Sequence, residues 1–477
     1  MTQRKGRLGC GRGSATAPTR VLALLRGVWG VVELAVPRKL LASLGSVDTG
    51  RLPVGVLRVL GMRHVLQAAA TFALPDEAVV KLGAGADALH ALTGFGLAAT
   101  SRSWRRAALT DSFVAVSFSA AGWLLRPRSS TFADRNLEGC EGMTARKVAV
   151  VTGGSAGVGR AVVRELANHG WDVGVLARGQ AGLDGAVADV QARGGKGVGL
   201  PTDVAVLDQV RAAADRIENE LGPIELWVNV AFSGSLRFFW DTDDDVFRRI
   251  TEVTYLGMVN GTRVALERMR PRNKGVIVQT GSALAYRGIP LQSAYCGAKH
   301  ALVGFTESVI TELKHEKSAV RVCMVQLPAV NTVQFDWNDS EFEEHPMPVP
   351  PIFQPEVPAR AVRYLADHPR RNLWVGASTA GTIVGNRLAP GLLDWYLGRT
   401  GVKSQTTKQD GPRYGSNVFQ ARDDEQDRGA HGMFDDQAHA SDPWSAVSMR
   451  RTPIAAGVLG SLVGAALLAL KVTRRTR

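Results

Sequence analysis

The sequence is poor in cysteine, with only four cysteines among 477 residues. They are Cys10, Cys140, Cys296 and Cys323, and no two of them are spaced as a CxxC pair. So few cysteines exclude a small secreted scaffold held together by disulfides. The spacing argues against a structural zinc site, and we predict no metal site. The simplest interpretation is a set of reduced thiols, as in the cytosol.

Acidic residues are scarce near the two ends of the chain, although the overall net charge is +13. Residues 1–147 carry 20 basic and 9 acidic side chains, whereas residues 148–400 carry 26 and 27. The last seven residues add four basic side chains and no acid. The positive charge therefore lies beside apolar segments, a pattern that favours an anionic membrane surface over nucleic acid. We expect a membrane as a partner and no nucleic acid.

Long hydrophobic runs without a charge are missing from the first 126 residues. Residues 1–19 are basic and rich in Gly and Ser, which predicts a disordered leader. Residues 20–126 hold four Ala/Val/Leu/Gly-rich segments, but charges interrupt them, and a charge at mid-bilayer is costly. We expect an all-α bundle of four helices in or on the membrane, with a soluble bundle as the alternative. Asp87 and His90 are three residues apart there, which predicts a polar helix contact, with a metal or proton-relay role as the alternative.

The segments around the central region differ in composition. Residues 127–145 contain Pro, Ser and Gly and are typical of a linker. Residues 401–452 are polar and predict a flexible tail. Residues 453–471 include 17 uncharged, mostly apolar positions and predict a single transmembrane helix, with an interfacial helix as the alternative. Residues 472–477 form a basic terminus.

The central region, residues 146–400, has short β-branched runs that alternate with helical stretches. This alternation indicates βαβ units and an α/β fold, with a Rossmann-type, doubly wound parallel sheet. The predicted strands are Val148–Thr152, Asp172–Ala177, Gly197–Leu200, Ile224–Asn229, Val276–Thr280, Ala319–Leu327 and Leu373–Gly376.

A glycine-rich turn joins the first of these strands to a helix. Glycines at such a turn let the backbone approach a pyrophosphate, which then lies at the helix N-terminus. The second strand ends at Arg178 and has no acid there to hold the ribose hydroxyls of NAD. Because Arg178 can pair with a 2′-phosphate, we expect NADP as the cofactor, with NAD as the alternative. The expected cofactor-binding residues of the turn are Thr152, Gly153, Ser155, Gly157, Val158 and Gly159.

Three polar residues further along the chain predict acid/base chemistry. Tyr295 and Lys299 are four residues apart, so that both side chains leave the same face of a helix. A lysine ammonium beside the phenol would lower the pKa of Tyr295 and make it a usable general acid/base. Ser282, at the end of a strand, can hydrogen-bond the substrate oxygen.

These motifs resemble the classical short-chain dehydrogenase/reductase family over about residues 146–400. The resemblance implies that the Tyr is the acid/base, that the Lys also holds the nicotinamide ribose, and that the Ser orients the carbonyl group. It implies further cofactor contacts through Asp203 at the adenine, Asn229 after the fourth strand, and Thr332 at the nicotinamide.

The chain also departs from the family pattern. The Asn-Asn-Ala-Gly of the family is Asn229-Val230-Ala231-Phe232 here, and its Pro-Gly is Pro328-Ala329. The Asn that supports the proton relay is replaced by Thr254, a possible tetrad substitute. These departures affect residues expected to support the proton relay, and they affect the expected hydride transfer less.

Together the observations predict a membrane-associated, NADP-dependent oxidoreductase whose catalytic domain faces the cytoplasm. A Pro-rich lid at residues 345–358 and nearby aromatic residues favour a lipophilic small-molecule substrate, an apolar alcohol/ketone pair. A homo-oligomer remains open as a further partner. The alternative function is a catalytically silent NADP-binding sensor or scaffold subunit at the membrane.

Overall fold

The computed structural model describes residues 17–43, 50–73, 77–100, 105–124 and 146–449, which belong to two compact units. The N-terminal unit comprises the described residues before 142, and the catalytic unit runs from Gly142 to Met449. The predicted linker, the predicted transmembrane helix at 453–471 and the basic terminus all lie outside the described residues. The first helix begins at Ala17, so it includes the last three residues of the predicted leader.

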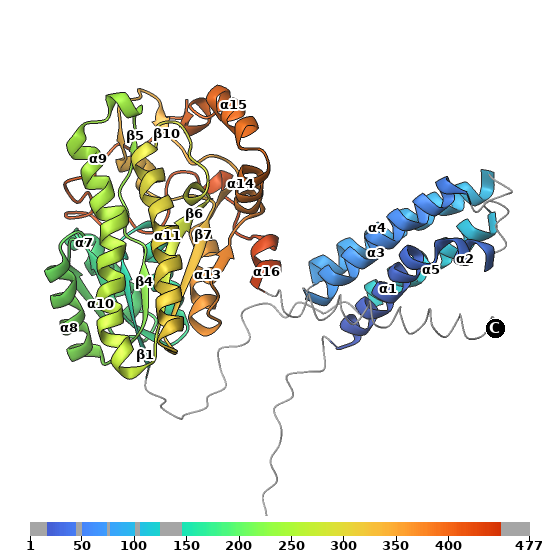
Figure 1. The fold of residues 1–477 in the computed structure, drawn as a ribbon, viewed down its shortest axis with the longest axis horizontal. Helices are drawn as coiled ribbons and strands as arrows, with labels where there is room; N and C mark the ends of the chain where they lie inside the picture. Colours follow the sequence, from blue (N-terminus) through green and yellow to red (C-terminus); the bar gives the residue numbers. More distant parts are fainter. Residues whose placement is uncertain (1–16, 44–49, 74–76, 101–104, 125–145, 450–477) are drawn as a thin grey trace, which may run out of the picture. The chain divides into compact units, whose positions relative to one another are not determined.

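The N-terminal unit is helical, as the sequence predicts (Figure 1). Helix α1 packs along α3, and α4 packs along α5. A short additional helix, α2, begins at Pro37, which suits the first turn of a helix because proline has no backbone N–H to satisfy. The helices are α1 (Ala17–Ala35), α2 (Pro37–Ser43), α3 (Arg51–Ala73), α4 (Glu77–Thr100) and α5 (Arg105–Leu124). In the described part of the chain, none of the helices has both the length and the apolarity that a membrane span requires.

The N-terminal unit buries polar side chains and exposes apolar ones. Its buried polar residues include Arg26, Glu33, His64 and Asp87, each no more than 2% exposed. The large exposed apolar side chains are Val21, Leu24, Leu25, Val56, Val59, Met62, Leu66, Leu82, Leu89, Leu92, Leu97, Phe113 and Val116. So many large apolar side chains at the surface, above buried charged groups, are unusual for a water-soluble bundle, although the unit also has buried apolar residues such as Leu22 and Leu41.

The catalytic unit is built on a seven-stranded, fully parallel sheet with the strand order β12-β7-β6-β4-β1-β2-β3. All seven predicted strands are present, which confirms the α/β interpretation. Their bounds are β1 (Lys147–Thr152), β2 (Trp171–Ala177), β3 (Gly197–Pro201), β4 (Ile224–Asn229), β6 (Val276–Ser282), β7 (Arg321–Leu327) and β12 (Asn372–Trp374). The near-continuous burial of β1, β2 and β4 follows from helices covering both faces.

Two hydrophobic cores lie on the two faces of the sheet. On one face α6 (Gly157–Asn168), α7 (Gln180–Gln191) and α13 (Glu356–Asp367) pack on the strands. On the other face lie α8 (Leu207–Leu221), α10 (Gly257–Arg272) and α11 (Ser293–His315). The carboxyl ends of the strands point toward the end of the unit where α15 and β10 lie (Figure 1).

The remaining elements lie mostly in the connections at that end, except α16, which packs beside α13 and β12. The helices are α9 (Asp244–Thr251), α12 (Gln334–Trp337), α14 (Ala377–Leu388), α15 (Pro390–Thr400) and α16 (Pro443–Met449). The two-residue strands are β5 (Ser235–Leu236), β8 (Ala329–Val330), β9 (Asp339–Ser340), β10 (His345–Pro346), β11 (Ile352–Phe353) and β13 (Thr406–Thr407).

The catalytic unit extends beyond the predicted boundary at residue 400. Residues 401–449 contain little regular structure, as the polar composition predicts, but they are packed on the unit rather than separate from it. Val418 and Phe434 are buried, at 0% and 1% exposure. These widely spaced apolar anchors, together with backbone hydrogen bonds, hold a segment whose average composition resembles a flexible tail.

Candidate active site

Two adjoining cavities lie at the carboxyl ends of the strands. One has a volume of about 410 Å³ and the other about 140 Å³, and they share lining residues, among them Val158, Phe232 and Thr332. The strand order reverses at β1, which has β2 on one side and β4 on the other. Ligands of doubly wound sheets bind at such a switch point.

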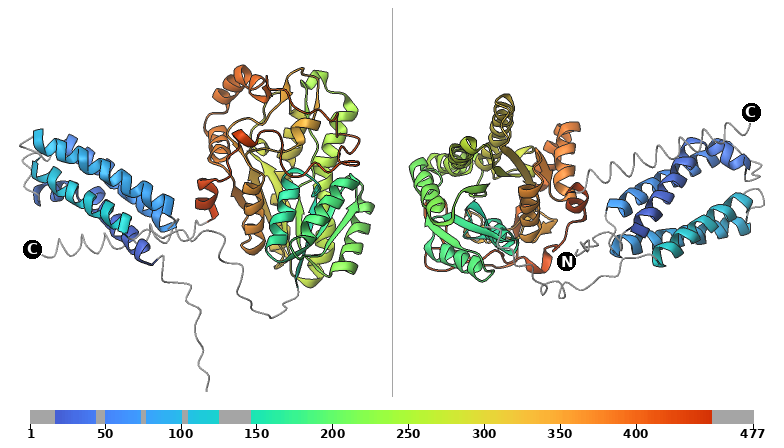
Figure 2. Two further views of the ribbon diagram at one scale, coloured as in Figure 1. Left: turned by 180° about the vertical axis from the view of Figure 1, so that it is seen from behind. Right: turned by 90° about the horizontal axis from the view of Figure 1, so that it is seen from below.

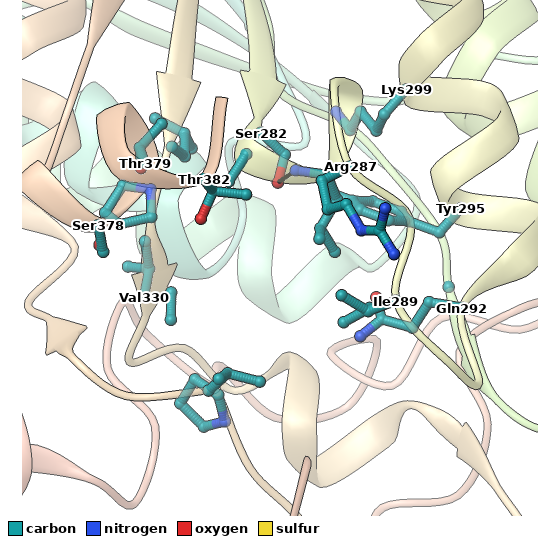
Figure 3. A pocket seen from close by; sticks show the side chains of 18 of the residues that line it. Ser282, Arg287, Ile289, Gln292, Tyr295, Lys299, Val330, Ser378, Thr379 and Thr382 are labelled. Atoms are coloured by element: carbon teal, nitrogen blue, oxygen red, sulfur yellow. Dashed lines mark hydrogen bonds between the residues drawn. The ribbon is translucent and has the colours of Figure 1, made fainter. Parts of the chain in front are cut away.

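The three predicted catalytic residues line the larger cavity together (Figure 3). Ser282 is the last residue of β6, and its hydroxyl accepts a hydrogen bond from the Leu284 backbone N–H at 3.1 Å. Tyr295 and Lys299 both lie on α11, one turn apart. The Lys299 Nζ donates to the Thr280 carbonyl oxygen at 2.7 Å and lies 5.5 Å from the centre of the Tyr295 ring.

Phe232, one of the departures from the family pattern, packs against this pair. Its ring meets the Tyr295 ring edge-on at a centroid distance of 5.7 Å, and the Lys299 Nζ lies 5.9 Å from its centre. An aromatic ring here removes water from both polar groups.

This burial sets the acid/base properties of the pair. Desolvation lowers the pKa of Lys299 to about 7. Burial also raises the pKa of Tyr295, and a hydrogen bond with Ser282 opposes that shift. Burial, and not the neighbouring Lys299, sets the direction of the Tyr295 pKa here, and the expected lowering by Lys299 stays a prediction.

Thr254 lies in a π-helical turn, Glu252–Leu256, between α9 and α10. Its hydroxyl accepts a hydrogen bond from the Ser233 N–H at 3.0 Å and donates to the Ser233 carbonyl oxygen at 2.9 Å. Thr254 is fully buried and lines neither cavity. It therefore fixes the backbone of the segment next to Phe232, and π-turns of this kind are frequent at functional sites.

The glycine-rich turn lines the smaller cavity, with Gly153, Ser155, Gly157, Val158 and Gly159. Gly153 has a positive φ of 66°, and a Cβ there would lie 2.8 Å from Cα of Ala231. A Cβ on Gly159 would lie 2.0 Å from the Gly153 carbonyl oxygen. Only glycine fits these positions. Ala156, the N-cap residue of α6, offers no capping side chain, and the N–H of Gly157 at this helix N-terminus donates to a backbone carbonyl, that of Gly429.

Arg178 and Asp203 lie at the other end of the smaller cavity. Asp203 forms an ion pair with Arg249, so two guanidinium groups are close to one another at this end. Burial and the charge of Arg249 lower the pKa of Arg178. Together with Thr332, these residues bring most of the predicted cofactor-binding set into one cavity.

Two of the predicted cofactor residues point elsewhere. The Thr152 hydroxyl accepts hydrogen bonds from the backbone N–H groups of Val230 and Ala231. The fully buried Asn229 side chain bonds Gln279 and Trp227 inside the protein. Neither residue lines a cavity, so both support the cleft and are not placed to contact the cofactor directly.

A segment that the sequence did not assign to the site crosses the smaller cavity. We call residues 414–434 the strap; they run across the N-termini of α6 and α7 (red end of the colour scale in Figures 1 and 2). The Gly157 N–H donates to the Gly429 carbonyl oxygen at 3.0 Å, and the Gly182 N–H donates to the Asp423 carbonyl oxygen at 2.9 Å. Arg178 donates to the carbonyl oxygens of Asn417 and Val418.

The strap also brings an acid to the end of β2. Asp423 is 6% exposed and lines the smaller cavity beside Arg178, and its Oδ2 has no hydrogen-bond partner. A Cβ on Gly179 would lie 2.0 Å from the Asp423 Oδ1, so glycine permits this approach. The acid that is missing from the carboxyl end of β2 is thus supplied about 245 residues later. In the sequence, the only feature that could have indicated this acid was the acidic run Asp423–Asp427.

The larger cavity is mainly apolar. The Pro-rich lid contributes Met347, Pro348 and Val349, which confirms that the lid lies over the site. Of the aromatic residues expected at the mouth, Phe232 and Phe335 line this cavity. On the side facing Tyr295 in Figure 3, helix α14 presents the hydroxyl-bearing side chains of Ser378, Thr379 and Thr382. The Thr379 hydroxyl is buried and has no hydrogen-bond partner.

Parallel sheet, glycine-rich turn and Ser-Tyr-Lys cluster together define a dinucleotide-binding oxidoreductase. The short chain dehydrogenase family model matches residues 147–342. A 3-oxoacyl-[acyl-carrier-protein] reductase of Bos taurus is 33% identical over 176 residues, which cover 37% of this chain and 73% of that protein. The chain belongs to the short-chain dehydrogenase family, whose members are oxidoreductases acting on alcohol and carbonyl groups.

Two further similarities cover more of the chain. The uncharacterized oxidoreductase YxnA of Bacillus subtilis is 28% identical over 288 residues, which cover 60% of this chain and 81% of that protein. Among solved structures, a short-chain dehydrogenase/reductase from Burkholderia phymatum in complex with NAD has a TM-score of 0.47 and 23% identity, and covers 53% of this chain and 95% of that one.

Proposed function

We propose that this enzyme transfers a hydride between NADP and an apolar alcohol/ketone pair at a membrane surface. The observation that carries the proposal is the joint position of Ser282, Tyr295 and Lys299 in the wall of an apolar cavity that adjoins the cavity at the glycine-rich turn. The bound nicotinamide would supply or accept the hydride.

The chain's own residues handle the substrate oxygen and its proton. In the direction of reduction, Ser282 orients the carbonyl oxygen and the Tyr295 hydroxyl donates a proton to it as the alkoxide forms. The raised pKa of Tyr295 keeps the phenol protonated and ready for this step. Lys299, with a pKa of about 7, can return a proton to the phenolate at neutral pH.

The lining of the larger cavity supports a lipophilic substrate. Its apolar side chains include Leu284, Ile289, Leu393 and Leu397, and burial of apolar surface drives binding at about 25 cal/mol per Å².

The cofactor preference depends on the charges at the end of β2. Arg178 and Arg249 favour the 2′-phosphate of NADP, because a guanidinium forms charge-assisted hydrogen bonds with phosphate. Asp423 supports the alternative, NAD, because a carboxylate here can accept hydrogen bonds from the ribose hydroxyls and repels a phosphate. We favour NADP because two arginines, one directly after β2 and one on α9, lie near the end of β2.

Two observations support attachment to a membrane. The N-terminal unit exposes apolar side chains and buries polar ones, as expected of a bundle surrounded by lipid. On the catalytic unit, Leu388, Leu392 and Trp395 of α14 and α15 are more than half exposed, and the neighbouring Leu393 and Tyr396 line the larger cavity. A lipophilic substrate could enter from the bilayer there. The cytoplasmic orientation and the transmembrane helix at 453–471 remain predictions.

The deciding experiment is a steady-state screen of NADPH and NADH oxidation with lipophilic ketones of increasing chain length. We expect kcat/KM to rise with chain length and to be higher with NADPH. Absence of turnover with every ketone, despite measurable cofactor binding, would favour the silent sensor. Fractionation of full-length protein and of variants lacking 1–140, 453–477 or both tests the membrane proposal separately. Full-length protein that stays soluble without detergent contradicts it.

A further inference from the structure

The N-terminal unit has a buried polar cluster that the redox chemistry does not use. Glu33 of α1, His64 of α3 and Asp111 of α5 come from three helices, and one donor atom of each lies within 4.8 Å of the others. The side chains of Glu33 and His64 are 0% exposed. Three converging groups of this type inside a helical unit form a common kind of metal site.

Most donor atoms of this cluster lack a hydrogen bond of normal geometry, and the nearest donor to Glu33 is the indole N–H of Trp29, which is itself without such a bond. Both carboxylate oxygens of Glu33, both ring nitrogens of His64, and Oδ1 of Asp111 lack hydrogen bonds. A buried polar atom without a partner costs about 1–3 kcal/mol, and more when it is charged. The Glu33 Oε2 and His64 Nε2 are 3.9 Å apart, which leaves the pair without a direct hydrogen bond.

Nearby charged groups are already paired with one another. Asp87 forms ion pairs with both Arg26 and Arg63 and is fully buried. These arginines are therefore not the missing partners of Glu33 or Asp111. On the opposite side, His90 Nε2 contacts Asp111 Oδ2 at 2.7 Å, which leaves Asp111 Oδ1 facing the cluster. A histidine that holds a carboxylate ligand in this way is typical of the shell around a bound metal.

A close contact between the backbones of α1 and α3 places Glu33 and His64 near one another. Helices α1 and α3 approach most closely where Gly30 meets Gly61, each three residues from one of the two side chains. A Cβ on Gly30 would lie 2.7 Å from the Gly61 carbonyl oxygen, and a Cβ on Gly61 would lie 2.5 Å from the Gly30 carbonyl oxygen. The two glycines therefore permit a crossing that no larger residue would allow, directly beside the donor atoms.

We propose that Glu33, His64 and Asp111 bind a divalent transition-metal ion such as Zn²⁺, with His90 as a positioning residue. One imidazole and two carboxylates suit first-row transition metals, whereas Mg²⁺ and Ca²⁺ prefer oxygen ligands alone. Metal–ligand distances of about 2.0–2.2 Å require the donor atoms to close by roughly 1 Å, which side-chain rotations can provide. Three protein ligands leave a coordination position open for water or a small ligand.

The test is a metal-binding measurement on the full chain in mild detergent, stripped with a chelator and then titrated with Zn²⁺ and, separately, Co²⁺. We expect one saturable ion per chain and, with Co²⁺, visible ligand-field absorption. Glu33→Gln and His64→Gln should each weaken binding at least tenfold, and His90→Gln should weaken it less. His169→Gln, at an exposed imidazole of the catalytic unit, should leave binding unchanged.

Two outcomes would overturn the proposal. One is wild-type protein, folded by circular dichroism and gel filtration, that binds no saturable Zn²⁺ or Co²⁺. The other is unchanged affinity in Glu33→Gln or His64→Gln. Because the wild-type titration needs no variant, the proposal can still be refuted when a substitution prevents folding. NADPH oxidation plays no part in the readout, so failure here leaves the proposed oxidoreductase function intact.

Discussion

Arg160 and Asp427 are 267 residues apart in the sequence, yet their side chains form a two-point ion pair, with Nη1–Oδ1 at 2.9 Å and Nη2–Oδ2 at 3.1 Å. Arg160 lies on α6, the helix that follows the glycine-rich turn, and Asp427 lies on the strap. The pair therefore fastens the strap across the cofactor cleft.

Removal of the Arg160–Asp427 ion pair should speed up the exchange of bound cofactor. Asp427→Asn removes a charge-assisted interaction of about 1.5–3 kcal/mol while Arg160 keeps its other partner, Asp189. We expect NADPH to dissociate about tenfold faster in stopped-flow fluorescence. Asp436→Asn, at an exposed acid nearby, is the control and should leave the rate unchanged. Equal dissociation rates for Asp427→Asn and wild type would show that the strap does not limit exchange.

Proton transfer should depend on the Tyr295 hydroxyl. Tyr295→Phe keeps the ring that packs on Phe232 and removes only the hydroxyl. Turnover in steady-state NADPH oxidation should fall by about 10² or more, whereas the cofactor Kd should stay within about twofold. A variant with near-normal kcat would refute the assignment of Tyr295 as the acid/base.

Cofactor choice should respond in opposite directions to the two charges at the end of β2. Arg178→Ala should weaken NADPH binding about tenfold and affect NADH little, because only NADPH carries the 2′-phosphate. Asp423→Asn, which keeps the shape of the side chain, should strengthen NADPH relative to NADH. Binding titrations with both cofactors check this. An equal loss of both cofactors in Arg178→Ala would contradict NADP as the preferred cofactor.

The pH dependence of carbonyl reduction should report on Lys299. Since its pKa is about 7 and the ammonium form returns the proton, kcat should decline as the pH rises through about 7. Phe232→Ala admits water, which favours the charged form, raises the Lys299 pKa toward its ordinary 10.5 and shifts the decline to higher pH. Phe238→Ala, at a ring stacked on Trp240, is the matched control. A profile that Phe232→Ala leaves unchanged would argue that another group controls the decline.

Local sequence patterns were enough to predict the parallel sheet, the glycine-rich turn and the Ser282, Tyr295 and Lys299 set that lines one cavity. Strand periodicity is local, and the i, i+4 spacing of Tyr295 and Lys299 fixes their common helix face. These features need no knowledge of distant residues. The same reasoning predicted four long apolar helices in the first unit, because charge interruptions and helical composition are also readable locally.

The surroundings of the site residues depend on contacts between segments that are distant in the sequence. Only the tertiary structure shows these contacts. The acid beside Arg178 comes from the strap, and one of the rings packed near Lys299 is that of Phe232, 67 positions away in the sequence. The convergence of Glu33, His64 and Asp111 requires three helices to cross. The direction of a pKa shift depends on burial, and burial is a property of contacts between segments that no local pattern specifies.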